Sequence, residues 1–318
     1  MQKENQCSDH ERGPETGNGI KMSKAASKTG LGPTVLVAIE QFFPESQRGI
    51  EDEFAYRILP FGMKLFVSLM RFSSIRNWMI RASEKDLPGM WAGMICRKKY
   101  IDDTLARSVH ESEIDTIINL GAGFDTRIFR VPESMNMQIF EIDQPEIIQK
   151  KKKQLSGLSY AIPFNVKLVS VDFDQEEIEP AIRSKGASFE SKSFFILEAV
   201  TQYLTEQGIG KTFDFLSKAS SGSQLVFTYI RRDFLEGKVL YGWEKGYHKY
   251  VLKDRVWLFG MDPGEWPSFL KQYGWEVLED VSYEELSSEY IHPTGRNLSS
   301  APVERILHAR KHDSQKKK

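Results

Sequence analysis

Two patterns of hydrophobic positions divide the chain. Up to about residue 111, apolar residues recur at helical spacing. This spacing predicts helices over 34–43, over 51–81 with a break near Pro60, and over 92–109. From residue 114 onward, short β-branched runs replace that spacing, and longer polar or helical stretches separate them. Such runs predict buried strands that alternate with helices.

The second pattern predicts an α/β fold. Strands that alternate with helices form βαβ crossovers, which give a mainly parallel sheet with helices on both faces. The last two runs lie close together and are expected as an antiparallel pair at one edge, so the sheet has seven strands and a Rossmann-like arrangement. The predicted strands are 114–120, 137–143, 165–173, 193–200, 224–230, 275–281 and 303–309.

The same division predicts the segments of the chain. Residues 1–26 are polar, lack periodicity and are expected to be a disordered tail. Residues 27–111 form a helical lid, residues 112–311 form the sheet domain, and residues 312–318 form a lysine-rich tail. Residues 231–268 interrupt the sheet domain between the fifth and sixth strands and are rich in aromatic side chains. This insertion is either a packed satellite cluster or a cap over a substrate pocket.

Composition narrows the class of protein only slightly. The 43 basic and 44 acidic side chains give a net charge of −1, so we expect neither nucleic acid nor a membrane as a partner. The basic run at 150–153 is expected to be a solvated helix face. Cys7 and Cys96 are too few for a disulfide framework, and no metal-ligand spacing is present. Without a signal peptide or a membrane span, the expectation is a cytoplasmic protein.

The clearest chemical motif follows the first predicted strand. That strand ends at Leu120 and runs into Gly121-Ala122-Gly123. Glycines permit a sharp turn and the close approach of a ligand, and open α/β sheets bind ligands at the carboxyl ends of their strands. Asp143 ends the second strand, 20 positions after Gly123, where a carboxylate accepts hydrogen bonds from both hydroxyls of a ribose. These elements predict a nucleoside-binding site.

The residues after the glycines indicate which nucleoside. A dinucleotide site needs a third glycine so that a pyrophosphate can lie on the helix N-terminus, but Thr126 stands there and Asp125 would repel a phosphate. A carboxylate suits a cationic ligand such as S-adenosylmethionine, with its sulfonium and ammonium groups. Acids also end the next two strands. Asp172-Phe173 would meet the adenine amino group and ring, and Glu198 would face the methionine end.

Together these segments resemble the leucine carboxyl methyltransferase family, in particular its uncharacterised bacterial branch. The resemblance covers roughly residues 28–311 and implies a class I methyltransferase fold with a helical lid and S-adenosyl-L-methionine as the cofactor. The segments that carry it are 119–127, 140–145, 171–173 and 197–204, with 97–103, 52–55 and 274–277 in support.

The resemblance also implies residue roles. Arg97 would hold the methionine carboxylate, since a guanidinium pairs with a carboxylate through two hydrogen bonds. Asp125 and Arg127 would mainly fix the loop. The family's usual Glu-Gly is Glu198-Ala199 here, and its usual Asp-Leu is Asp172-Phe173. The implied cofactor-binding set is Arg97, Gly121, Gly123, Asp143, Asp172, Phe173 and Glu198, with Lys28 and Ala122 as weaker candidates.

The function expected from these observations is S-adenosylmethionine-dependent O-methylation of a carboxylate or hydroxyl, on a small molecule or a protein C-terminus. A nicotinamide-dependent oxidoreductase and an inactive methyltransferase-like binding protein are the alternatives. A carboxylate is already a nucleophile at neutral pH, whereas a hydroxyl needs a general base. Tyr229 and His248 are weak candidates for that base, because a lone tyrosine or histidine is more often structural. The acceptor, the role of the insertion and the oligomeric state stay open.

Overall fold

The computed structural model describes residues 30–131, 137–158, 162–173 and 175–312. The predicted tail at 1–26 and the candidate Lys28 lie outside the described residues, as do residues 313–318.

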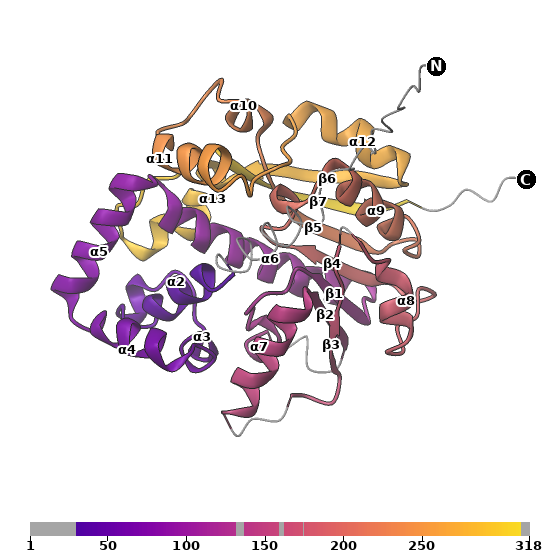
Figure 1. The fold of residues 1–318 in the computed structure, drawn as a ribbon, viewed down its shortest axis with the longest axis horizontal. Coiled ribbons are helices and arrows are strands. Elements are labelled where there is room, and N and C mark those ends of the chain that lie inside the picture. Colours follow the sequence, from indigo (N-terminus) through magenta and orange to yellow (C-terminus); the bar gives the residue numbers. More distant parts are fainter. Residues whose placement is uncertain (1–29, 132–136, 159–161, 174, 313–318) are drawn as a thin grey trace, which may run out of the picture.

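A seven-stranded sheet forms the centre of the protein, with the strand order β3-β2-β1-β4-β5-β7-β6 (Figure 1). Strand β7 runs antiparallel to both of its neighbours, and all other pairs are parallel. The predicted α/β fold and its seven strands are confirmed, including the place of the fourth strand beside the first. The strands are β1 (Thr116–Leu120), β2 (Gln138–Asp143), β3 (Val166–Ser170), β4 (Ser193–Leu197), β5 (Gln224–Ile230), β6 (Trp275–Ser282) and β7 (Glu304–Lys311).

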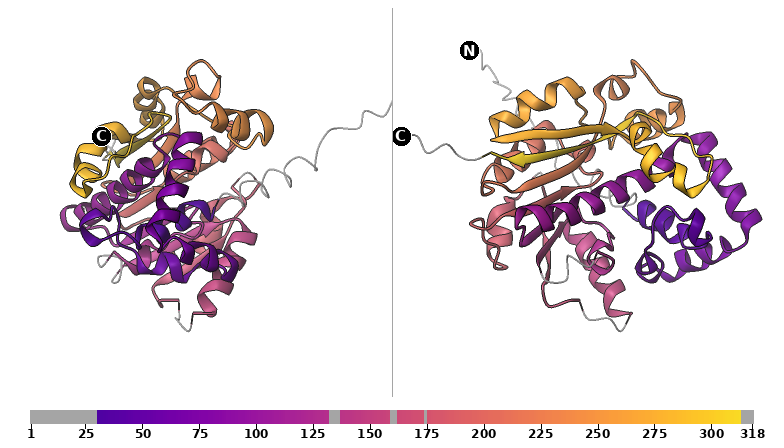
Figure 2. Two further views of the ribbon diagram at one scale, coloured as in Figure 1. Left: turned by 90° about the vertical axis from the view of Figure 1, so that its left-hand side faces the viewer. Right: turned by 180° about the vertical axis from the view of Figure 1, so that it is seen from behind.

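Helices cover both faces of this sheet because successive strand residues point to opposite sides. Ile117 packs in one hydrophobic cluster with residues of the lid and of helices α6 and α13, and Ile118 packs in another with residues of α8, α9 and α12. Helix α6 crosses the sheet on the side that faces the viewer in the right-hand view of Figure 2. The helices that cover the sheet are α6 (Met90–Ser112), α7 (Pro145–Ser156), α8 (Ile178–Arg183), α9 (Glu206–Leu216), α12 (Trp266–Gln272) and α13 (Tyr283–Tyr290).

The predicted lid at 27–111 also contains most of α6; from here on, the lid means the helices that precede α6, which share a hydrophobic core with the sheet. Ile39 and Val67 of the lid belong to the same buried cluster as Ile101 of α6 and Ile117 of β1. A shared core means that the lid is fixed to the sheet domain by apolar burial. Its helices are α2 (Gly32–Glu40), α3 (Glu53–Arg57), α4 (Phe61–Leu69) and α5 (Ser73–Asp86).

The long helix expected over 51–81 is three helices. Pro60 ends one of them, as predicted, and precedes α4. A second break between α4 and α5 was not predicted, and buried Arg76 of α5 packs across it. Its guanidinium donates to the Met70 carbonyl at 3.0 Å and lies 4.2 Å from the centre of the Phe43 ring. This contact satisfies a backbone acceptor at the end of α4.

The expectation that residues 150–153 form a solvated face is wrong at one position. Lys151 of α7 is completely buried and pairs with the buried carboxylate of Glu141 on β2 at 2.8 Å. Its ammonium group also donates to the Asp125 carbonyl at 2.8 Å. A run of lysines in the sequence does not show that Lys151 is buried, because its partner Glu141 lies on a strand that α7 covers. Lysines 150, 152 and 153 are exposed.

The turn after β1 requires glycine at its first position. Gly121 has φ of +72°, and a Cβ there would lie 2.3 Å from Cγ2 of Val200. We predict that Gly121→Ala lowers the free energy of unfolding by about 2–4 kcal/mol, through backbone strain and steric overlap. Denaturant unfolding measures this change.

Gly210→Ala is the matched control. Gly210 lies inside α9, and nothing lies within 4 Å of a Cβ placed there. This substitution should leave stability unchanged or raise it by up to about 1 kcal/mol. Equal effects at the two positions would contradict the tight approach between the first and fourth strand ends.

Candidate functional site

Asp143 and the glycine turn form one side of the site. Asp143 Oδ2 accepts from the Gly123 amide at 2.6 Å, and its Oδ1 accepts from the Gln144 amide at 2.7 Å. Burial raises the pKa of Asp143, and these two amides oppose that rise. Each carboxylate oxygen can accept a further hydrogen bond, so the side chain can serve two neighbouring hydroxyls.

The third strand end lies beside Asp143. The Val171 amide donates to the Asp143 carbonyl at 3.0 Å, which places Asp172 next to the turn. Asp172 is partly exposed and its amide donates to Glu176 at 2.8 Å. Phe173 is buried in the hydrophobic cluster that also contains Ile178 of α8. Its ring therefore packs in the protein core, and only Asp172 of this pair is partly open to solvent.

Glu198, directly after β4, binds three cations. Its Oε1 accepts from Arg97 Nε at 3.0 Å, and its Oε2 accepts from Lys98 Nζ at 2.9 Å and from Arg127 Nη2 at 3.1 Å. All four side chains are at most 8% exposed. Burial by itself would raise the pKa of Glu198, but Lys98, Arg97 and Arg127 together lower it to about 2.

Arg97 joins two carboxylates from distant strands. Besides Glu198, it donates through Nη1 to both oxygens of Glu304, at 3.0 and 3.3 Å. Burial would lower the pKa of Arg97, but Glu304 and Glu198 raise it above its ordinary value. Its Nη2 donates to Met94 Sδ at 3.4 Å, which is a weak acceptor. Nη2 is therefore the part of the guanidinium best able to bind an incoming carboxylate.

Asp125 is held by protein cations. It pairs with Arg127, and it lies 3.5 Å from Lys98 and 3.6 Å from Arg130. Burial would raise the pKa of Asp125, yet Arg127, Lys98 and Arg130 hold it well below the usual range. This carboxylate is neutralised within the protein, so it fixes the loop after the glycine turn.

The network extends into the lid. Arg130 donates to Asp102 of α6 at 2.8 Å and to Asp52 at 3.1 Å, and Asp52 also accepts from Thr126. Asp52 caps α3 by accepting from the Ala55 amide at 3.0 Å. These pairs connect α3, α6 and the glycine loop in one buried set of charges. Lys98, Arg130 and Glu304 were not predicted; Lys98 is adjacent to a predicted residue, whereas Glu304 carries no local signal.

A cavity of about 340 Å³ lies next to Arg97. It begins at the carboxyl ends of β4 and β5, where Ala199 and Ile230 line it, and Glu304 lines it at the start of β7. Its walls are mostly apolar and aromatic. The remaining lining comes from the lid, the start of α6, the insertion, the turn after β4, the start of α13 and the segment before β7: Gly32, Pro33, Leu36, Leu87, Gly89, Met90, Gly93, Met94, Gln202, Tyr203, Trp243, Lys249, Tyr250, Trp257, Tyr283, Ala301 and Val303.

The aromatic insertion forms its own hydrophobic cluster and also lines this cavity. Phe234, Trp257 and Val303 are buried in the cluster, and the Tyr250 ring stacks on Trp257 with centroids 4.7 Å apart. The indole of Trp243 donates to the Pro88 carbonyl at 2.6 Å, which ties the insertion to the turn before α6. The insertion contains the short helices α10 (Arg232–Leu235) and α11 (Glu244–Gly246) and a π-helical segment, Tyr247–Lys253.

The two candidate bases are not among the residues that line the cavity. Tyr229 is buried in the hydrophobic cluster that contains Ile118 and residues of α8, α9 and α12. Its hydroxyl donates to Asp280 at 2.7 Å. His248 is exposed on the insertion. Burial and Asp280 raise the pKa of Tyr229, so its hydroxyl stays protonated at neutral pH and cannot take a proton from an acceptor.

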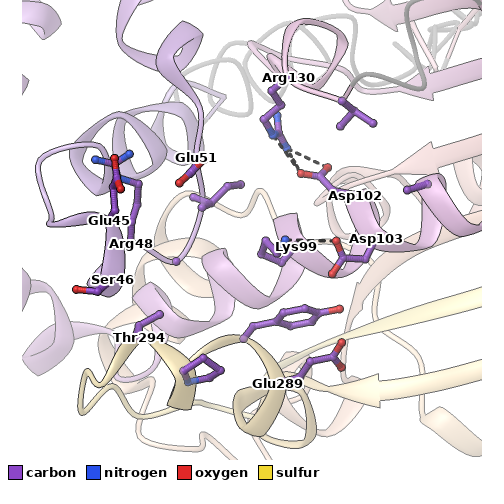
Figure 3. A pocket seen from close by; sticks show the side chains of 16 residues that line it. Glu45, Ser46, Arg48, Glu51, Lys99, Asp102, Asp103, Arg130, Glu289 and Thr294 are labelled. Atoms are coloured by element: carbon purple, nitrogen blue, oxygen red, sulfur yellow. Dashed lines mark hydrogen bonds and ion pairs between the residues drawn. The ribbon is translucent and has the colours of Figure 1, made fainter.

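A second cavity, of about 600 Å³, lies on the other side of α6 (Figure 3). Lys99, Asp102 and Asp103 of α6 line it. A helix has 3.6 residues per turn, so Lys99, two positions after Arg97, lies on nearly the opposite face of α6, and the three side chains point away from Arg97. Figure 3 shows Arg130 paired with Asp102 across this space. The larger cavity thus borders the outer end of the ion network and does not reach the strand ends.

None of the helices in the described part of the chain combines the length and apolarity that crossing a bilayer requires. Within the same residues, no three or more His, Cys, Asp or Glu side chains are grouped so as to hold a metal ion.

Comparisons with known proteins show the family to which the chain is similar. A family model described as leucine carboxyl methyltransferase matches residues 30–217. A Mycobacterium ulcerans (strain Agy99) protein, provisionally named an S-adenosyl-L-methionine-dependent methyltransferase, is 25% identical over 205 residues, covering 64% of this chain and 67% of that protein. The similarly named YktD of Bacillus subtilis (strain 168) is 36% identical over 121 residues, covering 37% of this chain and 40% of that protein.

Solved structures show the same fold. A crystal structure provisionally titled a methyltransferase from Thermobifida fusca YX has a TM-score of 0.55 at 18% identity, covering 73% of this chain and 86% of that one. A Streptomyces avermitilis protein of the DUF574 family has a TM-score of 0.53 at 17% identity, covering 73% and 88%. At these identities the likeness concerns the fold alone.

Glu198→Gln tests the ion network. The amide keeps the shape but leaves three buried cations with one carboxylate fewer, so the free energy of unfolding should fall by about 3–5 kcal/mol. The pKa of Glu198 in the folded protein is about 2, below its ordinary value of about 4.3. Its stabilising contribution is therefore present above about pH 4.5 and is lost as the pH falls toward about 2.

Unfolding of both proteins between about pH 2 and pH 7 measures this difference. Glu190→Gln, at an exposed position, should change stability by less than about 0.5 kcal/mol. A difference between wild type and Glu198→Gln that does not shrink in acid would show that Glu198 is not the ionised centre of the network.

Proposed function

Because the chain belongs to the leucine carboxyl methyltransferase family and is an S-adenosylmethionine-dependent methyltransferase, we propose that it methylates the oxygen of a carboxylate bound in the cavity beside Arg97. The acceptor is an apolar small molecule or the C-terminus of a protein. The observation that carries this proposal is the position of the cavity, which is lined by Ala199, two residues after the end of β4, and by Arg97, which pairs with Glu198.

The residues at the strand ends fit the cofactor chemically. Asp143 keeps acceptor capacity for the two ribose hydroxyls, and partly exposed Asp172 after the next strand would accept from the adenine amino group. Arg97 Nη2 would bind the methionine carboxylate, and Glu304, which lines the cavity, would supply negative charge near the ammonium and sulfonium. Gly121 and Gly123 allow the backbone to approach the ligand.

When bound, the cofactor supplies an electrophilic methyl group on a sulfonium, which is a good leaving group. The protein's task is then to align the acceptor oxygen and to exclude water. Trp243, Tyr250 and Trp257 of the insertion form an apolar wall of the cavity, and the turn before α6 closes another side. These walls position an acceptor at the carboxyl ends of the strands.

The cavity favours a carboxylate over a hydroxyl acceptor. No histidine occurs among the described residues that line it. Burial and nearby Glu304 hold the pKa of Tyr283 well above its usual value, and Glu304 is itself paired with Arg97. A hydroxyl would need a base, whereas a carboxylate is already ionised at neutral pH. Lys249 lines the same cavity and can attract an anionic acceptor.

Family membership also decides between the functions that the sequence left open. Membership in a methyltransferase family excludes the hypothesis of a nicotinamide-dependent oxidoreductase. It also favours an enzyme over an inactive binding protein, and turnover tests that choice directly.

Asp143→Ala should weaken binding of S-adenosylmethionine and of its demethylated product by about 10- to 100-fold, since charge-assisted hydrogen bonds to two hydroxyls are lost. Isothermal calorimetry measures this loss. Asp143→Asn, which keeps the shape, should fall between the wild type and the alanine variant. Asp115→Ala, an exposed position at the opposite end of β1, is the matched control and should bind normally. An unchanged affinity of Asp143→Ala for the cofactor would contradict the proposal that Asp143 binds the ribose.

Transfer of a labelled methyl group identifies the acceptor class. We expect label to pass to apolar carboxylic acids or to peptides with a free C-terminus, and to be released as methanol in mild alkali because methyl esters hydrolyse there. Matched alcohols and phenols should not be labelled. Alkali-stable label would contradict a carboxylate acceptor, and cofactor binding without transfer to any acceptor would indicate a binding protein.

A further inference from the structure

The lid exposes an unusual amount of apolar surface on α4, α5 and the turn between them. Of the eleven large hydrophobic side chains that are clearly exposed in the described residues, seven lie between positions 61 and 78. Phe61 is 84% exposed and Trp78 is 67% exposed. A surface helix normally has a polar outer face, so this surface needs a partner. The seven, here called the lid patch, are Phe61, Leu65, Phe66, Leu69, Phe72, Ile75 and Trp78.

The lid patch does not belong to the packing of the protein itself. Val67 of α4 is buried, as is Met70 directly after it, and Arg76 and Ile80 are the buried side chains of α5. The patch residues lie on the remaining surface of the same two helices. Figure 1 shows α4 and α5 at the edge of the molecule farthest from the sheet, where they are free to meet a flat surface.

The charge around the lid patch has one sign. Between Glu53 and Glu84 the sequence contains five basic residues and no acidic one. Arg71 and Arg81 are exposed, and Arg71 lies 5.0 Å from the centre of the Phe72 ring. Phenylalanine, tryptophan and leucine beside lysine and arginine, without acids, is the composition of helices that lie in the interface of an anionic membrane.

We propose that the lid patch docks the protein on an anionic lipid surface, with α4 and α5 lying in the plane of the membrane interface. Charge complementarity favours lipid over a second copy of the chain. In a two-fold dimer through this face, the basic side chains of both copies would meet without an acidic partner, and such like-charge contacts are costly. Anionic headgroups supply the missing negative charge.

This placement differs from the expectation based on net charge. A net charge of −1 argues against membrane binding only if charges are evenly spread, and exposed Arg71 and Arg81 lie in a stretch, 54–83, that contains no acidic residue. Docking would also bring the acceptor cavity near the lipid. Helix α5 leads into Leu87 and Gly89, which line the cavity, and Asp86 at its end pairs with Lys245 of α11.

Vesicle flotation of the full chain tests the proposal. The probes are phosphatidylcholine vesicles with roughly 30 mol% phosphatidylserine and vesicles of phosphatidylcholine alone. We expect binding to the anionic vesicles that weakens at high salt, and little binding to the neutral ones. Leu65→Glu with Phe72→Glu should reduce anionic-vesicle binding by about tenfold or more, and Arg71→Glu with Arg81→Glu should also reduce it.

Phe164→Glu is the matched control, because Phe164 is 89% exposed but lies outside the lid. It should bind vesicles like the wild type. Circular dichroism and cofactor calorimetry of each variant establish that it is folded. Failure of the wild type to bind either vesicle would overturn the proposal, as would a concentration-dependent dimer that Leu65→Glu with Phe72→Glu dissolves. The readout does not involve methyl transfer, so it is independent of the proposed function.

Discussion

The carboxylate of Glu198 is the group on which the rest of the site depends. It stands at the end of β4 and accepts hydrogen bonds from Arg97 and Lys98 of α6 and from Arg127 of the glycine loop. Apolar burial attaches the lid to the sheet, but it does not fix the lid in one position along the strand ends. Buried charges have strict geometric requirements, since an unpaired one is costly. The network therefore sets where α6 lies, and α6 in turn sets the walls of the acceptor cavity.

One helix thus serves three regions. The face of α6 that carries Arg97 meets the strand ends and the cavity. Its opposite face, with Lys99 and Asp103, lines the second cavity, and its first turn continues from α5 and the lid patch. The insertion completes the acceptor cavity from the other side. Trp243 holds it to Pro88, so the lid and the insertion meet at the mouth of the cavity, next to the surface that we place on lipid.

Local patterns predicted the parts of this structure that local chemistry determines. The strands, the glycine turn and the acids that end β2 and β4 are encoded by short runs. Contacts between distant residues were not predictable. Glu304 is 207 positions from Arg97, and nothing in its neighbours reveals the pair. Lys151 looks solvated in the sequence because its partner Glu141 lies on another element. Ala199 shows the limit of a motif: it keeps the left-handed φ of +56° that the family's glycine would suit, and its amide donates to Thr228 at 2.8 Å.

The central claim is that the strand ends hold the cofactor with its sulfur facing the aromatic cavity. A crystal structure of the full chain with S-adenosylhomocysteine tests this most directly. The account predicts the ribose hydroxyls on Asp143, the homocysteine carboxylate on Arg97, and the sulfur open to the space lined by Ala199, Tyr250 and Trp257. A ligand bound in the second cavity beyond α6, or one whose sulfur faces away from Tyr250 and Trp257, would contradict it.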